Sequence, residues 1–70
     1  MSEYVVSCVE RARQSIRTLR EQGARPKKIE LSNDVIIEMW RSGGLVDRLM
    51  FMGLPIIERG DLKNHIQAVP

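Results

Sequence analysis

Apolar residues recur at a helical spacing over the first third of the chain. They stand four, three, four and three residues apart and form the single apolar seam of an a/d heptad pattern. The seam consists of Val5, Val9, Ala12, Ile16 and Leu19. Ser2 can cap the start of this segment, and Gly23 is the kind of residue that ends a helix in the left-handed conformation. The pattern predicts a helix from Ser2 to Gln22.

A polar–apolar alternation over residues 28–31 predicts a short strand, and Ser32 directly after it is suited to cap a second helix. The apolar side chains that follow fall on one broad face of that helix. They are Val35, Ile36, Met39 and Trp40. Residues 42–44, Ser-Gly-Gly, end the helical pattern. We therefore expect a second, shorter helix before residue 42.

Residues 49–57 are the densest apolar run in the chain. Gly53 and Pro55 interrupt this run, and both are unfavourable inside a third helix. The Gly permits a bulge or a close backbone approach, and the Pro removes one donor from a strand ladder. The run therefore predicts two strands, residues 48–52 and 55–58, or one strand bent sharply between them.

Together these elements predict one α+β domain over residues 1–70. A long N-terminal helix and a short second helix are expected to pack on a small, mainly antiparallel sheet. We expect this sheet to be centred on residues 49–57, which would form the floor of the core, with Trp40 and Phe51 packed inside it. Residues 63–69 are expected to add a last edge strand.

The length of the chain predicts self-association. A core built from 70 residues is near the lower limit of independent stability. Cys8 has no second cysteine for a disulfide, and Cys8 with His65 cannot supply the four ligands of a closed zinc site. We therefore expect a homo-oligomer that forms through the apolar seam, and we expect no metal and no cofactor.

The composition is that of a globular protein in a reducing compartment. The chain is 43% hydrophobic and 29% charged, and no apolar run approaches the length of a membrane span. The first residues lack the basic and apolar regions of a signal peptide. We expect a cytoplasmic protein without a membrane partner.

The positive charge is concentrated at the start of the sequence. Residues 1–28 carry seven basic and three acidic side chains, although the whole chain has a net charge of only +2. Arg13, Arg17 and Arg20 fall on one flank of the first helix, and Lys27 and Lys28 follow it. These five residues are candidates for contact with a protein partner or with nucleic acid. Glu10 and Glu21 beside the arginines, and the lack of an aromatic platform, favour the protein partner.

Residue constellations typical of catalysis are missing from the sequence. The single Cys and the single His lie far apart, and residues 43–44 lack the Lys-Ser/Thr of a phosphate-binding loop. The acidic residues near the predicted turns have no spacing that forces them together. They are Asp47, Glu58 and Asp61. We expect no catalytic residues and no enzymatic activity.

Two stretches of the second part of the chain, "PKKIELS" and "FMGLPII", resemble a segment of tailed-phage capsid proteins, in which a helix precedes an apolar strand with Gly-x-Pro. The resemblance covers residues 26–69 and implies a small phage-encoded protein. In that setting we expect a non-enzymatic protein-binding module, an inhibitor or adaptor that acts on a host protein or defence system in the host cytoplasm. The alternatives are a basic nucleic-acid-binding protein and a minor virion-assembly protein.

Overall fold

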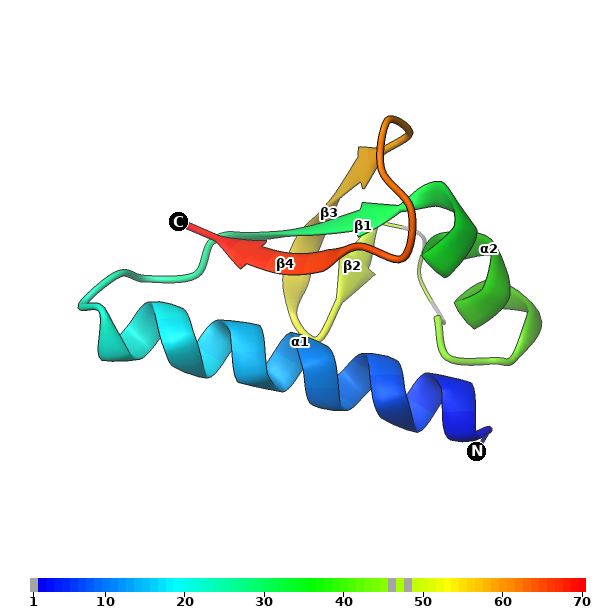
Figure 1. The fold of residues 1–70 in the computed structure, drawn as a ribbon, viewed down its shortest axis with the longest axis horizontal. Helices are drawn as coiled ribbons and strands as arrows, with labels where there is room; N and C mark the ends of the chain where they lie inside the picture. Colours follow the sequence, from blue (N-terminus) through cyan, green and yellow to red (C-terminus); the bar gives the residue numbers. More distant parts are fainter. Residues whose placement is uncertain (1, 46, 48) are drawn as a thin grey trace.

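The protein has the expected α+β fold, with two helices and a four-stranded sheet (Figure 1). The structure is a computed structural model, and it describes all residues except 1, 46 and 48. In chain order the elements are α1 (Glu3–Glu21), β1 (Lys28–Ser32), α2 (Asn33–Arg41), β2 (Met50–Phe51), β3 (Leu54–Arg59) and β4 (Ile66–Val69). The predicted long first helix, short second helix and last edge strand are therefore confirmed.

The sheet is mixed, with the strand order β2-β3-β1-β4. β1 runs parallel to β3 and antiparallel to β4, and β2 pairs antiparallel with β3. The expectation that the sheet is centred on residues 49–57 holds only for the second half of that run, because β3 and β1 are the two interior strands and β2 lies at an edge. Ile29 and Leu31 of β1 are fully buried, whereas Leu49 is 74% exposed. The first half of the apolar run thus lies at an edge of the sheet, and its second half shares the interior with the short alternating strand β1.

Residues 49–57 form a tight hairpin rather than one bent strand. Met52 and Gly53 both have positive φ, 54° and 78°, as the two central residues of a type I′ turn require. The turn places Met50 opposite Pro55 and Phe51 opposite Leu54. Of the two strands predicted here, the second is confirmed, and the first is shorter than expected. Residue 48, its predicted start, lies outside the described residues.

Helix α1 covers one side of the sheet and lies along β4 (Figure 1). The Ser2 side chain accepts a hydrogen bond from the amide of Val5 at 3.2 Å, and Gly23 ends the helix with φ 78°. Further along, the Ser15 hydroxyl accepts a hydrogen bond from the amide of Ala68 at 2.8 Å. A side chain of α1 thereby satisfies an amide of the edge strand β4. Without this acceptor, the amide would be free to pair with a strand of another chain.

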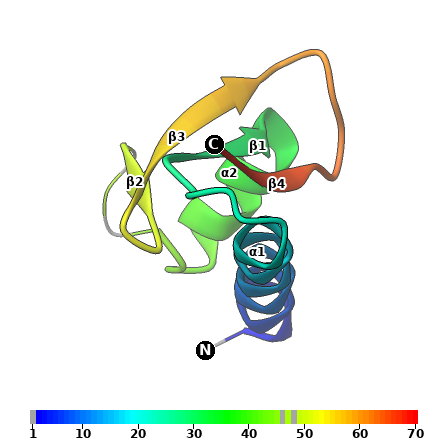
Figure 2. The same ribbon diagram turned by 90° about the vertical axis from the view of Figure 1, so that its left-hand side faces the viewer.

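The core lies between the sheet and the two helices, which lie on the same side of it (Figure 2). Its buried residues come from both helices and from β1, β2 and the segment after α2. They are Cys8, Ala12, Ile29, Leu31, Val35, Ile36, Met39, Leu45 and Phe51. Phe51 is 5% exposed, as expected, but Trp40 is 44% exposed, so the expectation that it is a core residue is wrong.

The other face of the sheet is open. Along each long strand, side chains that point to this face alternate with those in the core. Lys28, Pro55 and Gln67 are exposed there, next to Ile29, Ile56 and Ala68 on the helix side. This two-layer arrangement exposes the open face of the sheet and the outer side of α1. It also exposes large apolar side chains on α2 and on the β2–β3 hairpin, namely Ile37, Trp40, Met50 and Met52.

Candidate interaction surface on the first helix

The apolar seam of α1 serves first as part of the protein's own core. Val5 is 2% exposed and Ala12 is fully buried, and Val9 packs against the core cluster from its edge. Gly44 approaches Val5 so closely that a Cβ at this position would lie 2.7 Å from a Val5 methyl group. Ile16 and Leu19 are half-buried. What remains of the seam at the surface is therefore its C-terminal half.

Arg13, Arg17 and Arg20 gather around Ile16, and together these four residues form what we call the arginine flank. They line a surface hollow of about 360 Å³ with Glu21. The predicted spacing thus does bring the three arginines together. The helix supplies this geometry, because residues three and four positions apart are neighbours on its surface.

The arginine flank is poorly neutralised by the rest of the chain. Arg13 lies 3.5 Å from Glu10, but both side chains are more than half exposed, at 56% and 65%. Such an exposed pair contributes little, at most about 1 kcal/mol. Within the described residues, Arg17 and Arg20 form no ion pair with an acidic side chain. Their positive charge is therefore available to an outside group.

The two lysines in the predicted contact set are not part of this flank. The Lys27 amide donates to the carbonyl of Val69, and Lys28 begins β1 with its side chain on the face of the sheet opposite to Ile29. Arg25, which the sequence did not single out, lies nearer: Arg20 and Arg25 line a second hollow of about 450 Å³ with Pro26. The loop between Gly23 and Pro26 is the sequence feature that could have identified Arg25, because it turns the chain back past the end of α1.

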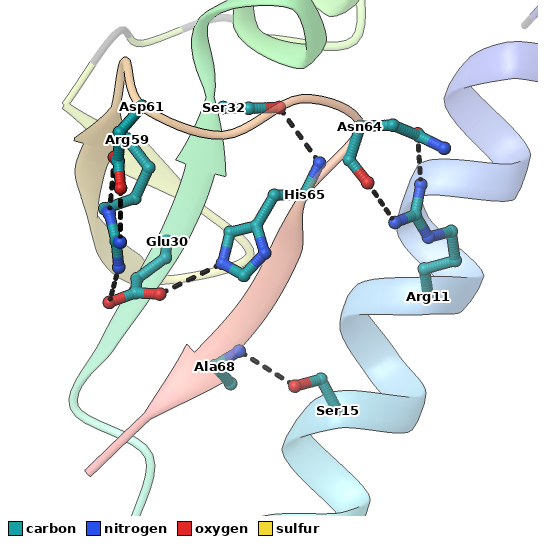
Figure 3. A network of polar contacts seen from close by, with 9 residues as sticks. All are labelled: Arg11, Ser15, Glu30, Ser32, Arg59, Asp61, Asn64, His65 and Ala68. Atoms are coloured by element: carbon teal, nitrogen blue, oxygen red, sulfur yellow. Dashed lines mark hydrogen bonds and ion pairs between the residues drawn. The ribbon is translucent and has the colours of Figure 1, made fainter.

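The open face of the sheet carries a network of charged side chains (Figure 3). Glu30 lies at its centre: one of its carboxylate oxygens is 3.0 Å from His65 Nε2, and the other accepts from Arg59 at 3.1 Å. Arg59 also forms two hydrogen bonds with Asp61, of 3.0 and 2.8 Å. The hydrogen bond from His65, and next the charge of Arg59, lower the pKa of Glu30. Arg59 lowers the pKa of Asp61 to about 2.

A second group of hydrogen bonds fastens the loop before β4. The amide of His65 donates to Ser32 Oγ at 2.9 Å, and the amide of Asn64 donates to the Asp34 carboxylate. The Ser32 hydroxyl, and next the Asn64 amide, lower the pKa of Asp34. Arg11 of α1 reaches both the side chain and the carbonyl of Asn64, at 2.8 and 2.7 Å (Figure 3). These charged groups hold the loop to α1 and α2.

The residues considered for catalysis do not meet. Cys8 is buried on the helix side of the sheet, and burial raises the pKa of its thiol, whereas His65 contacts Glu30 on the open face. Tyr4 lies beside Cys8, and burial raises its pKa to about 12.

The three acids near turns have separate surroundings. Asp47 accepts from the amide of Leu49, Asp61 pairs with Arg59, and Glu58 lies beside Ile37. In the part of the chain that the structure describes, no three His, Cys, Asp or Glu residues form a metal-binding group.

Comparison with known proteins found no relative of this chain. No family model, no curated protein and no solved structure matches this chain. Among the described residues there is no helix long and apolar enough to cross a membrane.

Proposed function

We propose that the protein is a non-enzymatic protein-binding module whose partner docks on the arginine flank of α1. The observation that carries this proposal is the exposure of Arg17 and Arg20 beside the half-buried Ile16, with no acidic side chain in the described residues paired to either. Arginine side chains next to an apolar side chain are typical of protein interfaces.

Self-association remains part of the proposal. Val5 and Ala12 are used inside the protomer, so a homo-oligomer would rely on the C-terminal half of the seam. Ile16 belongs to that half and also to the arginine flank. Binding of a second copy and binding of a partner are therefore competing uses of one surface, which is the behaviour expected of a small adaptor that exchanges partners.

The biological setting follows from the resemblance described above. A phage-encoded inhibitor or adaptor would act on a host protein or defence system in the host cytoplasm, and a minor role in virion assembly is a close variant. Both need a surface that recognises a protein, and neither needs a catalytic group.

Nucleic-acid binding is the second candidate. Arg20 lines both hollows, so the positive surface continues from α1 to Arg25. A run of guanidinium groups of this kind can contact phosphates, and its binding would weaken steeply with salt. Glu21 within the first hollow weakens this candidate relative to a protein partner.

The proposal is tested by affinity capture from the native cell extract, with and without nuclease. The variant Arg17→Glu/Arg20→Glu removes the charge of the flank. The matched control Arg41→Glu/Lys63→Glu changes the net charge equally at exposed positions outside the arginine flank. A protein captured by the wild type and the control, lost with the flank variant and resistant to nuclease supports the proposal. Capture that depends on nuclease-sensitive material, or that the flank variant retains, contradicts it.

A further inference from the structure

We propose that the arginine flank recognises an acidic amphipathic helix, with carboxylates that face the arginines and one apolar side chain seated against Ile16. This inference rests on the proposed function and names the chemistry of the partner. It follows from the charge of the flank, from its apolar positions and from the fixed geometry of the adjoining loop.

The outer flank of α1 carries a second periodic stripe. Its members stand three, four, three and four residues apart, as in a helix that packs on another helix. They are Val6, Val9, Arg13, Ile16 and Arg20. The stripe lies away from Ser15, which faces β4. Val9 and Ile16 are partly buried by the protein itself. The three other members of the stripe are exposed, so a helix that packs on them would have to come from a partner.

The stripe is apolar at one end and positive at the other. Val6, at the apolar end, is 47% exposed. Ile16 lies between Arg13 and Arg20, with Arg17 at the outer rim of the same hollow. A partner helix with acidic residues one turn apart and a leucine-like side chain between them matches this sequence of groups. The rise along α1 from Arg13 to Arg20 is about 10 Å, which three carboxylates on a partner helix also span.

The basic end of the surface is held in place before a partner arrives. The amide of Ala24 donates to the Leu19 carbonyl at 2.9 Å, and the Lys27 amide donates to the Val69 carbonyl at 2.9 Å. Arg25 lies between these two fixed points and shares its hollow with Arg20. A fixed loop loses little conformational entropy on binding. Less of the favourable electrostatic energy of Arg25 is therefore offset when a partner binds.

A protein helix fits this surface better than a nucleic-acid backbone. Glu21 lines the same hollow as the arginines and repels phosphates, whereas a partner helix can place a basic or neutral residue there. The charged phosphates of a nucleic-acid backbone also match Ile16 and Val6 less well than an apolar side chain of a helix does. A second copy of α1 fits less well, because it would bring arginines against arginines.

The test uses the full chain and a fluorescein-labelled model peptide, a three-heptad helix with glutamates one turn apart and leucines between them. Binding is measured by fluorescence anisotropy at near-physiological salt. Two comparison peptides replace either all glutamates by glutamine or all leucines by alanine. A labelled thymidine oligonucleotide of similar charge represents nucleic acid.

The proposal expects saturable binding of the acidic leucine peptide and weaker binding of both comparison peptides. Arg17→Glu/Arg20→Glu should weaken binding about tenfold or more, while the control Arg41→Glu/Lys63→Glu changes it less than about twofold. Val6→Glu, at a position that is 47% exposed, should also weaken it. In sedimentation, the bound sample should contain one chain and one peptide.

Four results would overturn the inference: no saturable binding, binding unchanged by Val6→Glu, binding of the oligonucleotide at equal strength, or a peptide that fails to separate self-associated chains. This failure differs from a failure of the proposed function. If capture from the extract depends on Arg17 and Arg20 but the peptide does not bind, the protein-binding function stands and the acidic helix is wrong. If the peptide binds but the extract yields no flank-dependent protein, the proposed function fails instead.

Discussion

Glu30 and His65 meet on the open face of the sheet, where His65 Nε2 lies 3.0 Å from a Glu30 carboxylate oxygen (Figure 3). The two residues are 35 positions apart in the sequence. This contact joins the central strand β1 to the segment before β4, and Arg59 extends it to β3. The network therefore links the three longest strands on the side of the sheet that no helix covers.

The first prediction concerns acid stability. The folded pKa of Glu30 is lowered below its usual value of 4.5, so its contribution to stability is complete above pH 4.5 and disappears as pH falls through the folded pKa. Glu30→Gln should lower the free energy of unfolding by about 1 kcal/mol at neutral pH and by less in acid. Urea unfolding at several pH values measures both effects. Glu38→Gln, at an exposed position of α2, is the control, and equal losses at all pH values would refute the role of the Glu30 charge.

The second prediction compares a buried leucine of β1 with an exposed leucine of the apolar run. Leu31→Ala in β1 removes a fully buried side chain and should cost about 2–4 kcal/mol of unfolding free energy. Leu49→Ala makes the same chemical change at a side chain that is 74% exposed and should cost less than about 0.5 kcal/mol. Thermal or urea unfolding of the two variants side by side provides the comparison. Equal losses would mean that the Leu49 side chain also belongs to the core.

The third prediction concerns the contact between α1 and the edge strand. Ser15→Ala leaves the amide of Ala68 without its 2.8 Å acceptor and should cost about 1 kcal/mol. Thr18→Ala is the matched control on the same helix, because among the described residues the Thr18 hydroxyl donates only to the carbonyl of Gln14 within α1. Hydrogen exchange of the Ala68 amide should become faster in the first variant and remain unchanged in the second. Unchanged exchange in both would show that α1 does not protect β4.

The fourth prediction concerns self-association. We expect the free protein to sediment as a dimer or larger homo-oligomer at micromolar concentration. Ile16→Glu should make it monomeric, because Ile16 is a partly exposed residue in the C-terminal half of the seam. Analytical ultracentrifugation over a range of concentrations measures this. A wild-type protein that stays monomeric would show that the seam is an internal core stripe only.

Local signals in the sequence predicted the local structure well. Ser2 and Gly23 mark the ends of α1, and the Gly-x-Pro pattern indicated a break that proves to be a hairpin turn. The three arginines of α1 lie together because helical spacing alone determines their positions. These features depend on neighbouring residues, so one sequence suffices to predict them.

Features that depend on long-range pairing could not be predicted. β1 becomes central only because β3 and β4, from later in the chain, pair on either side of it. Arg59 and Glu30 are 29 positions apart, and nothing in their local sequence indicates their contact. The same holds for Lys28, whose side chain lies on the opposite face of the sheet from α1 although it follows the helix closely in sequence.

The central claim is that a protein partner docks on the arginine flank, and one measurement tests it most directly. The isotopically labelled full chain is mixed with the partner obtained by affinity capture, and the amide signals that shift are mapped onto the structure. We predict that the shifts concentrate on residues 13–20 of α1 and on the loop around Arg25. Shifts confined to the β2–β3 hairpin or to the open face around Glu30, with α1 unchanged, would contradict the account.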